Sequence, residues 1–420
     1  MAAKQKDIRM KIYFLILFFL YSLPGMCSII HVGKNERIKT IKEAISHANE
    51  LDTVLVHGGY YKEGNIFISK KIVLKGIDLP TLDGENKYQI ISVKANGVVI
   101  DGFKIVHSGT SSLEDIAGIK LYDVRDAVVQ NNVLDDTFFG IYTQRGTNCL
   151  IQNNVLTSAR KQEQASGNGI HCWKSDSMRI INNSIKGHRD GIYFEFVTNS
   201  VIWRNVSTSN LRYGLHFMFS NSDSYISNIF RYNGAGVSVM FSHHVKMFNN
   251  YFEENWGDGA YGILLKEIAD SYIDGNHFIK NTSAIYMEGV SRTIMVKNVF
   301  RNNGWAIKIQ ASCMETELHN NVFLGNTFDV GTNGSLVLNN FDGNYWDKYE
   351  GYDLNKNGIG DLPYRPVSMY SMIVERNPPA MILFHSFMTS LLDKTEKVLP
   401  TLTPENLADT KPLMKLPFRL

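Results

Sequence analysis

The stretch NNVLDDTFFGIYTQRGTNCLIQNNVL, residues 131–156, decides the fold because it contains one structural unit and the start of its copy. The five residues QNNVL at 130–134 recur 22 residues later at 152–156, and a Gly-Ile pair at Gly140 lies between the two copies. Self-similarity at a fixed spacing is the signature of a repeat architecture, so the motif has to be followed along the chain before any element is assigned.

Two markers show that the repeat is nine-fold. The second Asn of the motif stands at Asn132, Asn154, Asn183, Asn205, Asn228, Asn250, Asn276, Asn298 and Asn321. The Gly-Ile pair and its variants begin at Gly118, Gly140, Gly169, Gly191, Gly214, Gly236, Gly262, Ala284 and Ala306. Both series advance by 22 or 23 residues, except for two longer steps of 29 and 26 residues that fall at the same places. Two separate markers therefore share the same two insertions.

The period within each copy is two, which indicates strands. Ile192 and Phe194, for example, alternate with Tyr193 and Glu195, as one face of a strand alternates with the other. A coil of about 22 residues with short strands is typical of an all-β, right-handed parallel β-helix, a pectate-lyase-like solenoid. Leucine-rich repeats have similar length, but their LxxLxLxxN pattern is missing. We expect Ile and Phe ladders inside and an Asn ladder in a turn, where stacked amides donate and accept along the axis.

The sequence outside the regular coils predicts two caps. Residues 38–48 have helical periodicity and read as an amphipathic capping helix of an N-terminal region, 29–100. The regular coils are expected over 101–341, and a loop and docking or capping extension over 342–420. Its apolar stretch at 380–392 is too short to span a bilayer. It either closes the solenoid or docks on another subunit, and we favour docking.

Residues 1–28 have the features of a cleaved secretory signal peptide. Four basic residues precede an apolar run at 12–23 and the helix-breaking Pro24. This segment carries a net charge of +3, so the +2 of the whole chain becomes −1 without it, which argues against nucleic acid as a partner. The remaining cysteines, Cys149, Cys172 and Cys313, are odd in number and widely spaced. They predict neither a disulfide framework nor a zinc site.

The strand face opposite the core carries side chains that a solvated sheet does not need. Residues two and four positions after each Gly point outward, and they include Tyr142, His171, Trp173, Tyr193, Glu195, His216, Met218, Met240, Lys266 and Glu288. His216, Met218 and Met240, with His171, form a candidate copper site because thioether and imidazole suit Cu(I). Trp173, Tyr193, Glu195 and Lys266 are candidates for a binding surface. The alternative is that these side chains pack beneath a covering loop or a partner.

The segment DLNKNGIGD at 353–361 has the opening of a calcium-binding loop. Asp353, Asn355, Asn357 and Asp361 would supply oxygen ligands, together with the Ile359 carbonyl. The twelfth position of such a loop is Tyr364 rather than a bidentate Glu. A calcium site and a plain Asn/Gly turn both remain open.

Three stretches resemble the NosD family. These are IKEAISHANELDTVLVHGGYYKEGNI at 41–66, LHFMFSNSDSYISN at 215–228 and, most specifically, GNYWDKYEGYDLNKNGIGDLPYRP at 343–366. The resemblance covers roughly residues 29–375 and implies a periplasmic β-helix protein of nitrous oxide reductase maturation. It further implies association with the inner membrane through an ABC-type membrane subunit and its ATPase. Finally, it implies work beside a copper-chaperone lipoprotein in loading the copper sites of the reductase.

Two other functions fit the same scaffold. A polysaccharide lyase or uronate epimerase needs carboxylates with an Arg or Lys base in one groove. Glu195 and Lys266 are three coils apart, about 14 Å, and no Asp ladder accompanies them. A glycan-binding solenoid would use Trp173, Tyr142 and Tyr193 as stacking platforms.

Overall fold

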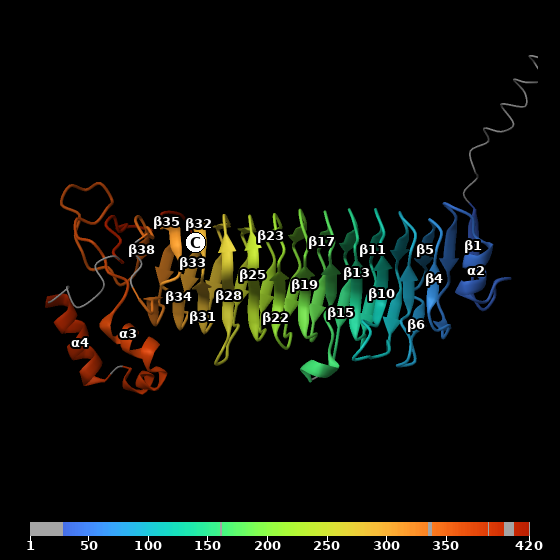
Figure 1. Ribbon diagram of the computed structural model, residues 1–420, viewed down its shortest axis with the longest axis horizontal. Coiled ribbons are helices and arrows are strands. Elements are labelled where there is room, and N and C mark those ends of the chain that lie inside the picture. Colours follow the sequence, from blue (N-terminus) through green and yellow to red (C-terminus); the bar gives the residue numbers. More distant parts are fainter. Residues whose placement is uncertain (1–27, 160–161, 335–337, 385, 399–406, 420) are drawn as a thin grey trace, which may run out of the picture.

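The computed structural model describes residues 28–159, 162–334, 338–384, 386–398 and 407–419. The predicted signal peptide lies almost wholly outside these residues. The chain winds into a long parallel solenoid whose coils stack along the long axis, with α2 at one end and α3 and α4 at the other (Figure 1). This confirms the predicted β-helix. Each regular coil contributes one strand to each of three walls, and all ladder pairings between coils are parallel.

The first wall, here called the long-strand wall, carries the candidate surface. Its strands are β4 (Ile66–Ile68), β7 (Ile91–Val93), β10 (Ala117–Tyr122), β13 (Phe139–Gln144), β16 (Ile170–Trp173), β19 (Asp190–Glu195), β22 (Tyr213–Met218), β25 (Ala235–His243), β28 (Tyr261–Ala269), β31 (Ser283–Glu288), β34 (Trp305–Ile309) and β37 (Phe328–Gly331).

The second wall joins the first in one 25-stranded sheet. It consists of β1 (Ile29–Val32), β2 (Thr53–Val56), β5 (Val73–Gly76), β8 (Val99–Asp101), β11 (Val128–Gln130), β14 (Leu150–Gln152), β17 (Arg179–Ile181), β20 (Val201–Trp203), β23 (Ser224–Ile226), β26 (Lys246–Phe248), β29 (Tyr272–Asp274), β32 (Ser291–Val296) and β35 (Met314–His319).

The third wall is a separate 13-stranded sheet. It consists of β3 (Tyr60–Tyr61), β6 (Thr81–Asp83), β9 (Lys104–Val106), β12 (Val133–Asp135), β15 (Val155–Thr157), β18 (Ser184–Lys186), β21 (Val206–Thr208), β24 (Ile229–Arg231), β27 (Tyr251–Glu253), β30 (His277–Ile279), β33 (Val299–Arg301), β36 (Val322–Leu324) and β38 (Tyr345–Trp346).

The Asn-Asn pair makes the turn between the second and third walls, and its two residues do different work. The first residue takes a left-handed conformation, with φ of +55° at Asn153, which Asn tolerates better than most residues. The second residue, Asn154, is buried and donates from Nδ2 to the Val129 carbonyl and to Asn183 Oδ1, both at 3.0 Å. Its own Oδ1 accepts from Asn132. The predicted Asn ladder is confirmed, and the left-handed residue is the one before it.

The interior consists of stacked apolar columns. Phe230, Phe252, Phe278, Phe300 and Phe323 stack with ring centroids 4.8 to 5.5 Å apart, and Trp346 closes the column. Glycine at the start of the long strands permits a close approach, because a Cβ on Gly236 would lie 2.4 Å from the Gly262 carbonyl oxygen. Ile192 and Phe252, which the two-residue period places inside, are both completely buried.

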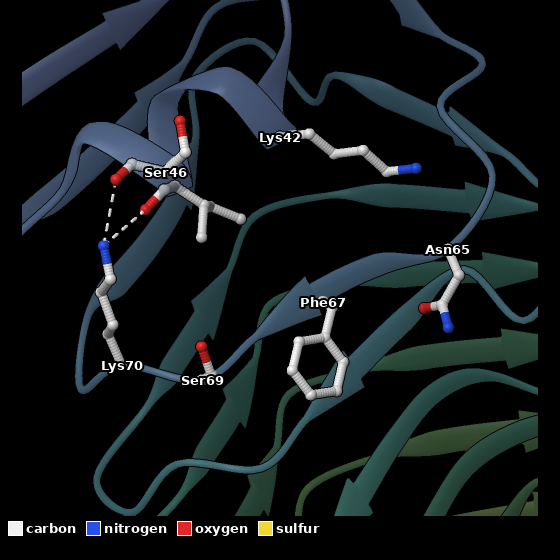
Figure 2. A pocket seen from close by; sticks show the side chains of 7 residues that line it. Lys42, Ser46, Asn65, Phe67, Ser69 and Lys70 are labelled. Atoms are coloured by element: carbon white, nitrogen blue, oxygen red, sulfur yellow. Dashed lines mark hydrogen bonds between the residues drawn. The ribbon is translucent and has the colours of Figure 1, made fainter.

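The N-terminal cap is the helix α2 (Ile41–His47), within the predicted segment. Thr40 Oγ1 accepts from the Glu43 N–H at its start, and Ile41, Ala44 and Ile45 pack on the first coils. Lys70 donates from Nζ to the carbonyls of Ile45, Ser46 and Ala48. It lines an open hollow between α2 and β4, and Figure 2 shows two of these three hydrogen bonds. A cation therefore satisfies carbonyls that the end of a helix leaves unpaired.

The C-terminal cap contains α3 (Met369–Arg376), the 3-10 helix η2 (Pro378–Leu383) and α4 (Phe387–Val398). The tail also returns to the solenoid, where Asp409 accepts from the backbone N–H of Gly343 and Asn344 and from Trp346 Nε1. Asp409 thereby ends the Asn ladder in place of another Asn. Among the described residues, no helix combines the length and apolar character needed to cross a membrane.

Candidate functional site

The long-strand wall places the predicted outward residues in one row. Trp173 pairs with Glu195, Glu195 with Met218, Met218 with Met240, and Met240 with Lys266 in the parallel ladder. All five side chains are partly exposed, whereas the intervening Phe217 and Val239 are buried. Strand spacing therefore sets the backbones of Met218 and Met240 about 4.8 Å apart on the same face. The thioether pair exists as the sequence predicts.

A second row, two residues earlier on the same strands, is a column of rings. Tyr142, His171, Tyr193 and His216 follow one another with centroids 4.5 to 4.8 Å apart. His171 and His216 are each only 7% exposed although they point away from the core. Tyr193 separates the two imidazoles, so His171 is not a neighbour of the thioether pair. For His171, the structure therefore fits packing beneath a covering segment better than a place in the copper site.

The first long insertion covers this column. It contains the 3-10 helix η1 (Glu163–Ala165), the short green helix that projects beyond β15 in Figure 1. Arg212 Nη1 lies 3.4 Å from Glu163 Oε1, and Asn168 Nδ2 lies 3.2 Å from Nδ1 of His171. Burial lowers the pKa of His171 to about 3, so this ring is neutral at physiological pH.

His216 sits in a charged pocket that the sequence did not reveal. Asp190, completely buried, lies 3.7 Å from His216 Nδ1 and accepts from Arg212 Nη2 at 2.8 Å. Burial alone would raise the pKa of Asp190, but His216 and the Arg212 charge outweigh it and hold that pKa below its ordinary value. Arg212 Nη2 also lies 3.5 Å from His216 Nδ1, and the buried His216 Nε2 has no hydrogen-bond partner.

Three exposed phenylalanines lie next to the thioether pair. Phe196, Phe219 and Phe241 stack with centroids 5.2 and 5.1 Å apart and are 39 to 44% exposed. Their φ values lie between +52° and +54°, and Arg145 and Glu267, at the same position in other coils, both have φ of +51°. Because this turn accepts charged residues elsewhere, the fold does not require Phe. Their recurrence five residues after the repeat glycine was the available sequence signal.

The predicted calcium loop is a compact Asx-rich turn. Asp353 accepts from the backbone N–H of Asn357 and Gly358, and Asp361 Oδ2 accepts from the N–H of Leu354. Asn355 and Asn357 accept from N–H groups two residues on. These hydrogen bonds account for the sequence pattern by turn geometry, and calcium at this loop stays a prediction.

The fold and the partly exposed row define a class: a parallel β-helix protein whose outer face presents thioethers and aromatic rings. Comparison with known protein families gives the same class. The family described as "Periplasmic copper-binding protein (NosD)" matches residues 157–351, and a right-handed β-helix region matches residues 28–185, which confirms the predicted hand.

Two curated relatives cover most of the chain. The "Probable ABC transporter binding protein NosD" of Stutzerimonas stutzeri is 26% identical, over 84% of this chain and 85% of its own. Its namesake from Pseudomonas aeruginosa is 25% identical, over 84% and 86%. These matches support assignment of the chain to the NosD family.

Solved structures share the fold alone. The catalytic unit of an α-1,3-glucanase from Streptomyces thermodiastaticus has a TM-score of 0.60 at 12% identity, covering 77% of this chain and 69% of its own. PfbA, a surface adhesin of Streptococcus pneumoniae, has a TM-score of 0.51 at 14% identity, covering 69% and 87%.

Proposed function

We propose that this protein is the periplasmic β-helix subunit of an ABC-type complex and delivers copper for copper-site assembly of nitrous oxide reductase. The observation that carries the proposal is the in-register pair Met218 and Met240 on the outer face, beside His216. The names of the family and of its relatives, a periplasmic copper-binding protein and probable ABC transporter binding proteins, support it.

The donor set suits Cu(I) held in transit. Thioether sulfur and neutral imidazole are soft or borderline ligands that select Cu(I) over hard cations. Met218 and His216 lie two apart on one strand, and Met240 is the neighbour of Met218 on the next coil. All three residues would contribute one donor each, and no carboxylate is needed. Copper is here the cargo of the protein, taken from one partner and released to another.

The phenylalanine stack fits the partner that brings the ion. Phe196, Phe219 and Phe241 directly follow Glu195, Met218 and Met240, so a protein seated on the rings would lie beside the thioethers. Contiguous exposed aromatic side chains are typical of protein contacts. We assign this surface to the copper-chaperone lipoprotein.

The C-terminal helices fit the membrane subunit of the transporter, whose ATPase would act through it. Ile382 in η2 is 89% exposed and Phe387 in α4 is 83% exposed, while Tyr370 of α3 is buried against the solenoid end. The segment is therefore attached to the solenoid and presents apolar side chains outward. We assign it to docking rather than to closure of the core.

The enzyme alternative lacks a reaction centre on this row. Glu195 and Lys266 are three coils apart, with the coils of Met218 and Met240 between them, and Lys266 Nζ is held in an ion pair with Glu288 at 3.2 Å. At that separation Glu195 and Lys266 cannot act on one sugar carbon. The names of the relatives also favour an accessory protein.

Copper affinity tests the proposal. Cu(I) would be titrated under anaerobic conditions against a chromogenic chelator, using the mature chain and the Met218→Leu/Met240→Leu variant, which preserves side-chain volume. We expect the variant to bind Cu(I) at least about tenfold more weakly, a loss of about 1.4 kcal/mol. Met314→Leu, at an exposed methionine on β35, is the matched control and should bind as the parent does. Equal affinity in the folded double variant would reject the row as the ligand set.

A further inference from the structure

Three possible metal ligands meet across the first two coils, far from the thioether row. His31 lies in β1, Glu36 in the loop after it, and His57 directly after β2. His31 Nδ1 is 3.0 Å from His57 Nε2, which is 3.7 Å from Glu36 Oε1. All three donor atoms lie within 4.8 Å of one another, and no other triad of His, Cys, Asp or Glu among the described residues does so.

The backbone brings the two imidazoles together. β1 and β2 pair in register, with Val32 opposite Val56, and both valines point into the core. His31 and His57 each adjoin one of these valines and therefore lie on the outer face. The His57 N–H donates to the Val32 carbonyl at 2.8 Å, and the His57 carbonyl accepts from Tyr61 Oη at 2.8 Å. The rings stack with an interplanar angle of 19°.

Hydrogen bonds within the loop that carries Glu36 hold this loop beside His31 and His57. Gly33 N–H donates to the Ile38 carbonyl and Glu36 N–H donates to the Gly33 carbonyl, both at 3.1 Å. Lys39 Nζ donates to the carbonyls of Lys34 and Glu36. A Cβ on Gly33 would come within 3.2 Å of His57 Cβ and 3.3 Å of Glu36 Cγ. Glycine at this position therefore allows the carboxylate and the imidazole to approach.

The geometry is close to that of a tetrahedral metal site. Ligand nitrogens at about 2.0–2.1 Å from a zinc ion lie about 3.3 Å apart, so His31 and His57 need to separate by only a few tenths of an ångström. Without a cation, only one of the two facing ring nitrogens can offer a lone pair while the other donates. A metal ion accepts both lone pairs, and Glu36 supplies a negative charge.

We propose that His31, Glu36 and His57 bind a borderline divalent cation of the zinc and copper(II) class, with water as the remaining ligand. Two imidazoles and a carboxylate favour such an ion over Cu(I), which prefers sulfur. Within the described part of the chain, β1 forms a ladder with β2 alone, and its Val32 also bridges to Ile38 in the loop that follows. The ion therefore clips β1 and the Glu36 loop to the second coil. This site does not depend on the proposed copper delivery.

Binding of zinc alone tests the site. The mature chain would be titrated with ZnCl2, and separately with CuCl2, against a chromogenic chelator. We expect one equivalent of zinc whose affinity falls about tenfold in His31→Ala and in Glu36→Gln, and about a hundredfold in His31→Ala/His57→Ala. Zinc should also slow hydrogen exchange of the β1 amides in the parent and not in the variants.

The chain offers a matched control for paired histidines. His243 and His244 are exposed and their Nδ1 atoms are 2.7 Å apart, but they belong to no triad of ligands. His243→Ala/His244→Ala and Met218→Leu/Met240→Leu should both keep the zinc site. Parental zinc affinity in His31→Ala/His57→Ala, or loss of the site in His243→Ala/His244→Ala, would overturn the proposal. Because His31 is exposed, His31→Ala is informative even if the double variant folds poorly.

Discussion

At the scale of the residue, Asp223 is a carboxyl group buried in the interior, where its ionisation destabilises the folded protein. The side chain is completely buried, Oδ1 accepts from the Ser200 N–H at 2.8 Å, and Oδ2 has no partner. Burial raises the pKa of Asp223 from 3.8 to about 8, so the folded protein holds a proton that the unfolded chain has already lost at neutral pH. The folded state is therefore stabilised below pH 4, and this contribution is lost as pH rises towards 8.

We expect Asp223→Asn to flatten the pH dependence of stability. An amide keeps the acceptor for Ser200 and carries no charge at any pH. The parent should lose stability between pH 4 and 8 by at most about 1.4 kcal/mol per pH unit, and the variant should lose less. Urea unfolding at pH 5, 6, 7 and 8 would show this, with the partly exposed Asp274→Asn as control. An unchanged slope in Asp223→Asn would mean that the native carboxyl is ionised.

At the scale of the element, the two residues of the repeated Asn-Asn turn differ in the burial of their hydrogen bonds. Asn153 has a positive φ at the surface and accepts one exposed hydrogen bond from Asn182 Nδ2, whereas the Asn154 side chain forms four hydrogen bonds within the buried ladder. Either residue could be the one that makes the motif recur. The structure indicates that removing the second is far more costly, because several buried groups lose their partners at once.

Glycine substitutions at the two positions separate these roles. Asn153→Gly should change stability by less than about 1 kcal/mol, because glycine adopts positive φ readily and the hydrogen bond that is lost, from Asn182 Nδ2, is exposed to solvent. Asn154→Gly should destabilise by about 3 kcal/mol or more, since unpaired buried donors and acceptors each cost about 1–3 kcal/mol. Urea midpoints of the two variants give the comparison. A larger loss at Asn153 would refute the role assigned to the ladder.

At the scale of the whole molecule, the proposed functions lie at different places along the rod. The histidine and glutamate cluster spans the first two coils, the thioether row is in the middle, and the apolar helices are at the C-terminal end (Figure 1). A rigid stack of coils keeps these places at fixed distances, as expected where each coil contacts only its neighbours.

Separation along the rod makes docking and copper binding independent. Ile382→Ser/Phe387→Ser removes exposed apolar surface from η2 and α4. We expect this variant to co-purify several-fold less with the transporter membrane subunit and to keep its Cu(I) affinity. Exposed Leu113→Ser, on a loop before β10, serves as the control. Undiminished co-purification would show that the membrane subunit binds elsewhere.

The sequence predicted the solenoid and which side chains face the core or point outward. It did not predict that the first long insertion, with η1, packs over part of the outer face. The two-residue period and the repeat length depend only on contacts between neighbouring coils. They therefore predict correctly that Ile192 and Phe252 face the core and that Met218 and Met240 face outward. The burial of His171 depends on where the 29-residue step folds, which no period specifies. Asp190 and Arg212 lie within the repeated coils, but only these two copies carry the charged pair, so the repeat does not predict it. The return of Asp409 to the last coil and the meeting of His31 with His57 involve segments outside the nine-fold repeat.

The most direct test of the proposed copper site is X-ray absorption at the copper edge on the protein loaded with one equivalent of Cu(I). We expect a coordination shell of two sulfurs and one nitrogen. In Met218→Leu/Met240→Leu the sulfur contribution should disappear. A shell of nitrogen and oxygen alone in the parent, or an unchanged sulfur shell in the variant, would contradict the assignment of copper to the outer row.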